Sequence, residues 1–278
     1  MSARVAEPLF VVDAFTGDGL AGNPAGVCPL SAWPSDATMQ SLAFELALSE
    51  TAFFAADGPD SYLLRWFTPE TEVDLCGHAT LAAAAVFFRT IDPAATVVRF
   101  STRSAGDLAV TRNADLLELD FPSQPAIRHA QEGLSAALGA APLEALSIPG
   151  RINMAVFGDE GTVRAIRPDM ARIAALDAQL LIATAPGAAC DFVSRCFAPR
   201  AGIPEDPVTG SAHTMLVPYW SKRLDKPRLH AKQISERGGE LFCTDRGDRV
   251  GIAGRATIRR EGRVEFGSMP PRSELAPV

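Results

Sequence analysis

The hydrophobic pattern of the chain predicts two helices, each surrounded by short β-strands. Residues 77–89 are rich in alanine and apolar on nearly every side, which is typical of a fully buried helix rather than a surface helix. Residues 209–224 also show a helical pattern, although Pro218 is expected to kink this helix or to mark its last turns. We therefore predict a mixed sheet that is wrapped around one central helix in each half of the chain.

Runs of β-branched, aromatic and other apolar residues indicate the strands of these sheets. In the first half they cover residues 9–15, 27–28, 51–54, 62–67, 97–100, 107–112 and 116–121. In the second half they cover residues 153–157, 163–166, 179–184, 192–197, 228–235, 240–244, 249–252, 256–259 and 264–266. A further helix is expected to begin at Ser35 or Asp36 and to bury Met39, Leu42, Ala43 and Leu46 on one face. The predicted fold class is therefore α+β.

A motif of the form Arg-x-Phe-x-Pro occurs once in each half. The copies begin at Arg65 and Arg195, which are 195 − 65 = 130 residues apart in a chain of 278 residues. In both copies a short polar loop, an aspartate, a glycine, a polar residue and a helical pattern follow. Such a repeat indicates a duplication that has produced two related domains facing each other across a cleft. We place these domains at residues 1–122 and 123–278, and leave open whether the last strand or tail returns to the first domain.

Composition and charge limit the classes of partner. Hydrophobic residues make up 47% of the chain and charged residues 21%, which is typical of a globular protein rather than a disordered one. The formal net charge is −7 at pH 7 and the pI is near 5.2, so neither nucleic acid nor an anionic membrane surface is an expected partner. A small anionic substrate is compatible with this charge, because the end of a helix can bind an anion locally.

No feature of the sequence indicates export or membrane insertion. Residues 1–8 lack the apolar core of a signal peptide, and the longest apolar run, residues 81–88, is far shorter than the ~20 residues that span a bilayer. The cysteines are odd in number and form no CxxC pair, so neither a disulfide framework nor a zinc site is indicated. They are Cys28, Cys76, Cys190, Cys196 and Cys243. We therefore expect a cytoplasmic protein with reduced thiols.

Two glycines stand where the central helices are predicted to begin. The first N–H groups of a helix have no intrahelical partner and carry roughly half a positive charge, so they bind carboxylate or phosphate groups. Gly77 and Gly210 allow a ligand to approach this backbone closely, and Thr209 and Ser211 add hydroxyl groups at the second helix. Ordinary capping would explain either glycine alone. The repetition in both halves favours a socket for a small anion.

Glu50 is the candidate for proton transfer. It lies between a helical and a β-type pattern, with Leu46, Leu48 and Phe53 near it in the sequence. Desolvation in an apolar pocket raises the pKa of a carboxyl group, which suits a proton shuttle near neutral pH. The alternative is a solvated glutamate in a loop.

Two polar residues of the motifs are further candidates. His78 can relay a proton or bond a substrate group, with a capping or core histidine as the alternative. Asp206 can orient a partner or accept a bond from a substrate amine, although an aspartate before a proline is also a common turn former. We interpret His129, His213 and His230 as structural.

Cys76 is open to two interpretations. A thiol beside a helix N-terminus has a lowered pKa, which makes it a candidate acid or base. A two-base racemase needs a second thiol on the opposite face of the substrate carbon, and the second motif has Pro207 or Val208 in the corresponding place. This difference argues against inversion by paired thiols. The other cysteines are interpreted as packing residues.

Two common motifs for phosphate binding and nucleophile chemistry are missing from the sequence. It has neither a phosphate loop that ends in Lys-Ser or Lys-Thr nor a GxSxG nucleophile elbow, and no group of His, Cys and carboxylate residues has metal-ligand spacing along the chain. We therefore expect acid–base chemistry on a small molecule, with no metal and no cofactor.

Several short motifs together resemble the phenazine-biosynthesis isomerase family, also called the PhzF-like proteins. They span the whole chain in the order expected for the family, and the chain length agrees. The motifs are Asp13-Ala14-Phe15, Gly22-Asn23-Pro24-Ala25-Gly26-Val27, Ser49-Glu50-Thr51-Ala52-Phe53, Cys76-Gly77-His78-Ala79-Thr80 and Glu205-Asp206-Pro207-Val208-Thr209-Gly210-Ser211-Ala212. Wider relatives with a similar duplicated fold are the diaminopimelate epimerases and the proline racemases.

The resemblance implies a fold, an assembly and an activity. The fold would be two pseudo-symmetric domains like those of diaminopimelate epimerase, each a curved or barrel-like mixed sheet around a central helix. The site would lie in the cleft between them, in a homodimer without a cofactor. The activity would be similar to that of trans-2,3-dihydro-3-hydroxyanthranilate isomerase, in which a glutamate in the position of Glu50 moves a proton between two carbons of a cyclic substrate.

The resemblance also implies the roles of individual residues. His78, Asp206 and Ser211 match residues that surround the substrate and assist proton movement. Substrate binding is assigned to Asn23, Gly77, Thr209 and Gly210, with a small carboxylate as the substrate. Two alternatives remain: an amino-acid epimerase or racemase that uses Cys76, and a small-anion-binding protein that catalyses nothing.

Overall fold

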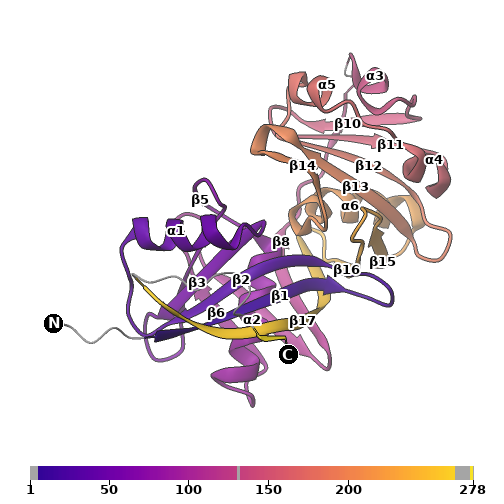
Figure 1. The fold of residues 1–278 in the computed structure, drawn as a ribbon. Coiled ribbons are helices and arrows are strands. Elements are labelled where there is room, and N and C mark those ends of the chain that lie inside the picture. The colour runs from indigo at the N-terminus through magenta and orange to yellow at the C-terminus, as the bar shows by residue number, and fades with distance from the viewer. Residues whose placement is uncertain (1–5, 130–131, 267–275, 278) are drawn as a thin grey trace. The chain divides into compact units, whose positions relative to one another are not determined.

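The computed structural model describes residues 6–129, 132–266 and 276–277, and the chain divides into two compact units (Figure 1). The first unit combines the chain up to Thr16 with Asn23–Asp120 and with the chain from Ala253 onward. The second unit combines Gly17–Gly22 with Phe121–Ile252. The short early segment Gly17–Gly22 thus belongs to the second unit, and the chain from Ala253 onward returns to the first, a return that the sequence left open.

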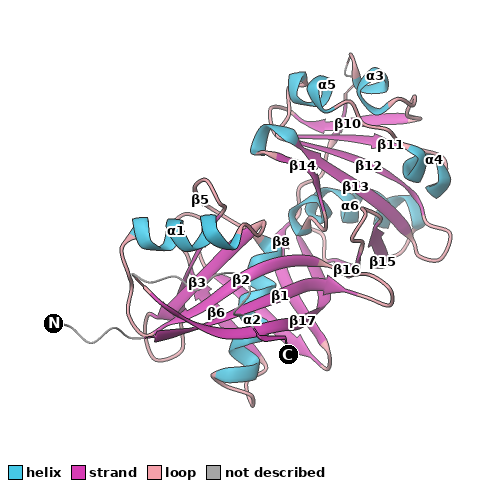
Figure 2. Ribbon diagram, viewed as in Figure 1, coloured by secondary structure: helices cyan, strands magenta, loops and turns pink. Residues whose placement is uncertain are grey.

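The strands of the first unit close into a barrel (Figure 2). They pair in the order β1, β2, β3, β4, β6, β7, β8 and β17, and β17 pairs again with β1. The pairs β2–β3 and β4–β6 are parallel. The bounds are β1 Ala6–Thr16, β2 Asn23–Leu30, β3 Glu50–Ala56, β4 Tyr62–Phe67, β5 Glu72–Val73, β6 Val97–Ser101, β7 Leu108–Asn113, β8 Leu116–Pro122, β17 Arg249–Glu265 and β18 Ala276–Pro277.

Helix α2, Gly77–Thr90, is the central helix of this barrel. Every residue from Gly77 to Phe88 except Ala85 is buried, as its apolar composition predicts. Alanine predominates because strands pack against the helix on several sides, and small side chains let the two backbones approach closely. The predicted central helix is confirmed.

Helix α1, Asp36–Leu46, packs on strands β3 and β4. Ser35 caps it by accepting a hydrogen bond from the N–H of Thr38. The buried residues are the predicted ones, namely Met39, Leu42, Ala43 and Leu46. They pack in one cluster with Phe53 and Phe67.

The second unit repeats the succession of strand pairs seen in the first. From β1 through β2, β3, β4 and β6 to β7, neighbours are antiparallel, parallel, antiparallel, parallel and antiparallel. The same succession runs from β10 through β11, β12, β13 and β15 to β16. Helix α6 follows β14 and precedes β15, as α2 follows β5 and precedes β6. The predicted α+β fold of two related domains is therefore confirmed.

The second unit has more and shorter helices than the first. Its strands are β9 Ile127–Arg128, β10 Glu144–Ile148, β11 Ile152–Val156, β12 Leu180–Pro186, β13 Phe192–Ala198, β14 Ile203–Asp206, β15 Arg228–Gln233 and β16 Gly239–Asp245. Its helices are α3 Leu134–Leu138, α4 Glu160–Ala165, α5 Met170–Ala175 and α6 His213–Leu224, with 3-10 turns at Pro199–Ala201 and Gly210–Ala212.

Residues 163–166, predicted as a strand, include the end of helix α4. Asp159 caps this helix, since its carboxylate accepts a hydrogen bond from the N–H of Thr162 at 2.8 Å. Val163 packs in the hydrophobic core as it would from a strand, so its apolar character does not distinguish the two structures. The strand prediction is wrong because it did not take the capping aspartate into account.

The Arg-x-Phe-x-Pro motif has the same structural role in both units. Arg65 on β4 donates from Nε and Nη2 to the two carboxylate oxygens of Glu72 on β5, at 2.7 Å each. Arg195 on β13 does the same with Glu205 on β14, at 2.7 and 2.8 Å. Each guanidinium also lies over the phenylalanine ring of its motif, 5.0 and 5.1 Å from the centroid. The motif thus fixes a short edge strand just before the loop to the central helix.

Pro218 lies inside helix α6, which continues to Leu224. A proline has no N–H, so the carbonyl of Thr214 loses its usual helical partner. The N–H of Gln124 donates to this carbonyl at 2.9 Å. The segment that enters the second unit is therefore bound to the backbone group that the proline leaves free.

Within the described residues, no helix is long and apolar enough to cross a membrane. All five cysteines are free thiols. Residues 1–5, which belong to the segment tested above for a signal peptide, lie outside the described residues.

Loss of the buried guanidinium of Arg65 should destabilise the first unit. The side chain is 3% exposed and binds Glu72 through two hydrogen bonds. We expect Arg65→Met to lower the free energy of unfolding by about 2–3 kcal/mol, because it leaves the partly buried carboxylate of Glu72 without its buried partner. Arg103→Met is the control, since Arg103 contacts the same Glu72 carboxylate from a side chain that is 53% exposed. It should cost less than about 1 kcal/mol in urea denaturation. Equal losses for both variants would contradict this account.

Candidate active site

Glu50 and Asn23 begin two parallel strands, so both lie at the same edge of the barrel sheet. Helix α1 ends at Ala47 in the left-handed conformation, and β3 begins three residues later at Glu50. There Glu50 pairs with Ala25 of β2. Only 12% of the Glu50 side chain is exposed. Glu50 is therefore not a solvated loop residue.

The start of helix α2 places two further groups beside this carboxylate. Nε2 of His78 lies 3.1 Å from Oε2 of Glu50. Sγ of Cys76, the residue before the helix, lies 3.4 Å from Nδ1 of the same ring. The imidazole thus stands between a carboxylate and a thiol, with one ring nitrogen toward each.

Asn23 and Ser49 orient the imidazole from a second direction. Nδ2 of Asn23 lies 3.3 Å from Nδ1 of His78, and the Ser49 hydroxyl donates to Oδ1 of Asn23 at 3.2 Å. Because Oδ1 accepts from Ser49, the amide presents its NH2 group to the ring, and Nδ1 is the acceptor. Neutral His78 then carries its proton on Nε2, toward Glu50. Asn23 was assigned to substrate binding on the family resemblance, and here its amide contacts the imidazole.

The contact between His78 and Glu50 is not aligned as a hydrogen bond, although the two atoms are 3.1 Å apart. Both atoms are buried, and neither has a hydrogen-bond partner among the described residues. An unsatisfied buried polar atom costs roughly 1–3 kcal/mol. Apart from their contact with each other, these two atoms are therefore available to bond an incoming group.

The pKa of Glu50 lies below its ordinary value, contrary to the expectation from the sequence. Burial acts to raise this pKa, but the positive charge of the nearby His78 and a contact with Cys76 outweigh burial. Burial acts to lower the pKa of His78, yet Cys76 and Glu50 raise it well above the ordinary 6.5. The carboxylate and the raised pKa favour the charged ring, whereas the amide of Asn23, which donates to Nδ1, favours the neutral ring.

The expected activation of Cys76 is wrong. Burial, followed by the carboxylate of Glu50, raises the pKa of this thiol to about 11. The helix N-terminus favours a thiolate, but its effect is smaller than the loss of solvation. Cys76 is therefore a protonated thiol at neutral pH.

The second motif forms a loop before helix α6. Asp206 ends β14, and its Oδ2 accepts the hydroxyl of Thr209 at 2.5 Å. The chain then makes a 3-10 turn, Gly210–Ala212, before α6 begins at His213. Gly210 is buried in this turn, and Ser211 is exposed. The predicted helix start at residue 209 is therefore a 3-10 turn that leads into the helix.

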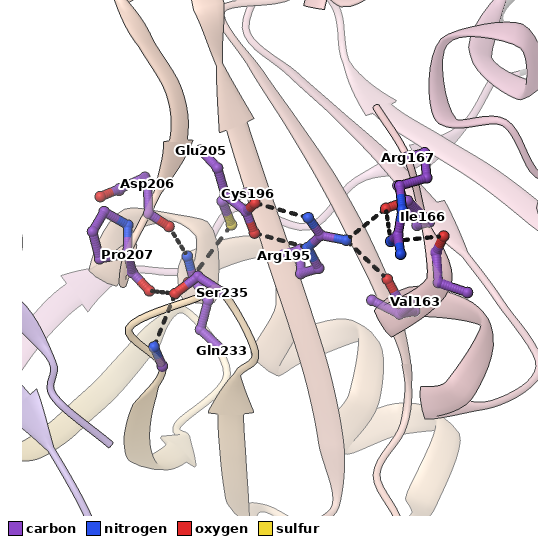
Figure 3. Close-up of polar contacts among 12 residues, drawn as sticks. Val163, Ile166, Arg167, Arg195, Cys196, Glu205, Asp206, Pro207, Gln233 and Ser235 are labelled. Atoms are coloured by element: carbon purple, nitrogen blue, oxygen red, sulfur yellow. Dashed lines mark hydrogen bonds and ion pairs between the residues drawn. The ribbon is translucent and has the colours of Figure 1, made fainter. Parts of the chain in front are cut away.

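Gln233, at the end of β15, holds this loop and was not predicted. Its fully buried amide donates to the carbonyl of Asp206 at 2.7 Å and accepts from the N–H of Thr209 at 2.9 Å. Figure 3 shows the first of these bonds, together with the Ser235 hydroxyl that donates to the carbonyl of Pro207. The partners of Gln233 lie 24 and 27 residues away, so no local sequence pattern marks it.

His213 is buried and has a packing role. Its Nδ1 donates to the carbonyl of Thr209 at 2.9 Å, and its ring lies 5.9 Å from that of Phe192. Burial lowers its pKa to about 4, so the ring is neutral at physiological pH. The interpretation of His213 as structural agrees with these contacts.

The acidic and imidazole groups of the first unit are replaced in the second. Strand registers place Leu180 where the first unit has Glu50, one residue before the position opposite the motif's phenylalanine. Ser211 stands in the place of His78, directly after the glycine at the start of each central segment. The two units therefore share the arrangement of strands and central helix, but the second unit lacks the carboxylate and the imidazole at these two positions.

Gly17, Gly19 and Gly22 have the GxGxxG spacing of a dinucleotide-binding loop. That motif requires a helix whose N-terminus binds the pyrophosphate, but here the chain continues into strand β2. The N–H groups of Ala21 and Gly22 donate instead to the carbonyls of Arg237 and Gly238, at 2.8 Å each. The glycine spacing here belongs to a structural loop.

The fold also brings together three groups of metal-ligand type. One ligand atom each from Glu50, Cys76 and His78 lies within 4.8 Å of the other two. Spacing along the chain did not predict this cluster, because Glu50 comes from a strand and the other two from the start of a helix.

Comparison with known proteins identifies the family. A family model described as phenazine biosynthesis-like protein (PhzC–PhzF) matches residues 12–262. The chain belongs to the phenazine biosynthesis-like family. The resemblance found in the sequence motifs is thereby confirmed.

Relatives in the phenazine biosynthesis-like family match this chain over nearly its whole length. A protein of Pseudomonas aeruginosa named as an uncharacterized isomerase is 49% identical over 259 residues, which cover 93% of this chain and 98% of that protein. The crystal structure of a PhzF-family protein from Enterococcus faecalis has a TM-score of 0.89 at 46% identity and covers 94% of this chain and 99% of its own. A hydroxyproline epimerase from Agrobacterium vitis has a TM-score of 0.59 at 12% identity, over 96% and 95% of the two chains. This last likeness concerns the fold.

The opposed pKa shifts of Glu50 and His78 predict a pH-dependent stability. Glu50, whose pKa is lowered, contributes stability above its unfolded pKa and loses it as the pH falls through the folded pKa. His78, whose pKa is raised, contributes below 6.5 and loses this as the pH rises through the folded pKa. Wild type should therefore exceed His78→Gln in free energy of unfolding by more at about pH 6 than at about pH 9. Urea denaturation at both values tests this, and a constant difference would contradict it.

Replacement of Gln233 should destabilise the second unit. Gln233→Met removes two hydrogen bonds, one to the carbonyl of Asp206 and one from the N–H of Thr209, and leaves this buried N–H without its Gln233 partner. At roughly 1–3 kcal/mol for an unsatisfied buried group, we expect a loss of about 1–3 kcal/mol in urea denaturation. Gln179→Met is the control, since Gln179 is an exposed residue of the same unit, and it should be nearly neutral. A neutral Gln233→Met would show that the loop does not depend on this amide.

Proposed function

We propose that this protein is a cofactor-independent isomerase that moves a proton between two carbons of a small cyclic or amino carboxylic acid. The observation that carries the proposal is the buried carboxylate of Glu50, 3.1 Å from an imidazole that is itself oriented by Asn23. The name of the Pseudomonas aeruginosa relative, an uncharacterized isomerase, supports the same class of reaction.

In the proposed reaction, Glu50 is the proton carrier. Its lowered pKa keeps it ionised at neutral pH, as a base must be before it acts. The carboxylate takes a proton from one substrate carbon, and the electron pair left behind shifts into the adjacent conjugated system. The resulting carboxylic acid delivers a proton to a second carbon, and in deuterated water its acidic proton exchanges with solvent before delivery. One proton is removed and one is added, and the electron pair stays with the substrate, so no oxidant or cofactor is consumed.

His78, which lies beside the Glu50 carboxylate, is proposed to assist this transfer. Nε2 of its ring faces Glu50, and a bond from this nitrogen to the substrate would stabilise the negative charge that develops on proton removal. Oriented donors of this kind contribute about 3–4 kcal/mol to transition-state stabilisation. Ser49 and Asn23 keep the ring in place during the reaction.

The second motif is proposed to bind the substrate. The backbone N–H groups at Gly77 and Gly210 suit a carboxylate, because both glycines begin a helical segment. Asp206 and Ser211 are proposed to bond polar groups of the substrate, and Thr209 to hold Asp206 through its 2.5 Å hydrogen bond.

The alternative of an epimerase or racemase that uses Cys76 rests on the contact between its thiol and His78. A pKa of about 11 makes this thiol a poor base at neutral pH. The two functions differ in which substrate carbons exchange their hydrogen with solvent. An epimerase removes and returns a proton at one carbon and inverts it, whereas the proposed isomerase removes a proton from one carbon and adds one to another.

Deuterium incorporation tests the proposal. Cyclic and amino carboxylic acids are incubated with the protein in deuterated water, and mass and NMR spectra report where the label enters. We expect Glu50→Gln to lower the exchange rate by about 10²–10⁴-fold, because the amide cannot accept the proton. Glu45→Gln, at an exposed glutamate of helix α1, is the matched control and should keep the wild-type rate. Retained exchange in Glu50→Gln would remove Glu50 from its role, and exchange lost only in Cys76→Ser would favour the epimerase.

A further inference from the structure

We propose that a cavity in the second unit binds a small organic carboxylate that has an apolar body. The cavity is lined by residues of β9, β10, helix α6 and the segment before β9. All the lining residues that the structure describes belong to the second unit, and none is among the groups proposed for proton transfer. The inference therefore does not rest on the proposed isomerase.

The cavity has the size of a small-molecule site, and its walls are held in place. Its volume is about 490 Å³, within the ~300–1,000 Å³ that is usual for such sites. Strand β9 is held against β10 by antiparallel pairing. The segment before β9 is held against helix α6, because the N–H of Gln124 donates to the carbonyl of Thr214. The cavity is thus formed before any ligand enters.

Part of the lining is apolar. It consists of Pro125, Ala126, Leu146 and Pro218, together with the ring of Tyr219. An apolar group that packs on these side chains leaves water, which favours binding. The lining therefore suits a ligand that carries a ring or a short hydrocarbon chain.

The rest of the lining has an excess of positive charge. Arg128, Lys222 and Arg223 contribute three positive charges and Glu144 one negative charge, so the balance is 3 − 1 = +2. The whole chain, in contrast, has a formal net charge of −7. A local excess of one sign attracts ligands of the opposite sign. The cavity therefore favours an anion on a protein that is acidic as a whole.

Glu144 orients the two arginines without using all of their donors. Nη1 of Arg223 donates to Oε1 of Glu144 at 2.8 Å and to the hydroxyl of Tyr219 at 3.1 Å, and Nη2 of Arg128 lies 2.9 Å from Oε2 of Glu144. A guanidinium has five N–H donors, and within the described residues Nε and Nη2 of Arg223 have no acceptor. The exposed Lys222 has no ion-pair partner there either. A ligand can accept hydrogen bonds from these groups while Glu144 stays in place.

The two parts of the lining together select the class of ligand. A carboxylate matches the planar fork of a guanidinium, and an apolar body matches the proline and tyrosine surface. Acetate and inorganic phosphate have the charge without the body. Benzyl alcohol has the body without the charge.

Amide NMR spectra of the isotope-labelled full-length protein test the proposal, with benzoate, 3-phenylpropionate and hexanoate as probes. We expect saturable shifts at residues 126–128, 144–146 and 219–223. Acetate, inorganic phosphate and benzyl alcohol should bind there at least about tenfold more weakly, because each lacks one of the two interactions. Shifts around Glu50 and His78 would report binding at the proposed isomerase site separately.

Two variants remove positive charge from the cavity. Lys222→Met and Arg223→Met should each weaken binding of the three probes by about tenfold, because each removes a charged donor. Arg164→Met is the matched control, since Arg164 is an exposed arginine of the same unit that pairs with a glutamate outside the cavity. It should bind the probes like the wild type. Lys222→Met carries the test if Arg223→Met does not fold, because the contacts around Glu144 do not include Lys222.

Three results would overturn the proposal. The first is the absence of saturable shifts at the cavity amides with all three probes. The second is binding that is equal in wild type, Lys222→Met and Arg223→Met, or equal for the probes and the control ligands. The third is shifts at these amides that follow protein concentration instead of the probes, which would show a second copy of the chain in the cavity. None of these results uses an isomerase assay, so the proposed function would stand.

Discussion

A helix that strands enclose on several sides can carry polar chemistry only near its ends. Helix α2 is buried along almost its whole length, and alanine predominates because the strands leave little room. Its polar groups therefore gather in the first turn, where His78 follows Cys76 and Gly77. A carboxylate that contacts this first turn therefore comes from a strand that begins at the same edge of the sheet. Strand β3 supplies it in its first residue, Glu50, and the parallel strand β2 supplies Asn23.

The strands and central helices of the two units could be predicted from the sequence, because they depend on local hydrophobic patterns. An all-apolar helix, alternating strands and a repeated Arg-x-Phe-x-Pro motif predicted two related units with central helices, and the structure has them. The family resemblance, rather than the repeated motif, placed Glu50 and His78 in one site, and in the structure their side chains lie 3.1 Å apart. The arginines of the motif bind the glutamates of the next short strand, a role that the sequence did not indicate.

Properties that depend on long-range contacts could not be predicted from the sequence. The apolar surroundings of Glu50 suggested a raised pKa, and the neighbouring imidazole reverses this. The helix N-terminus suggested a reactive thiol at Cys76, and burial reverses this as well. Gln233 bonds to residues more than 20 positions away and lies in an ordinary β-type run. In each case the decisive neighbour comes from another element.

Strand β17 has a consequence for the order in which the chain can fold during synthesis. The first barrel is not closed until β17, Arg249–Glu265, pairs with both β1 and β8. A ribosome will have released nearly all of the other described strands before that strand emerges. Until then β1 and β8 each present an open edge, which is the kind of surface that other chains can join. The first half of the protein is thus made early and completed last.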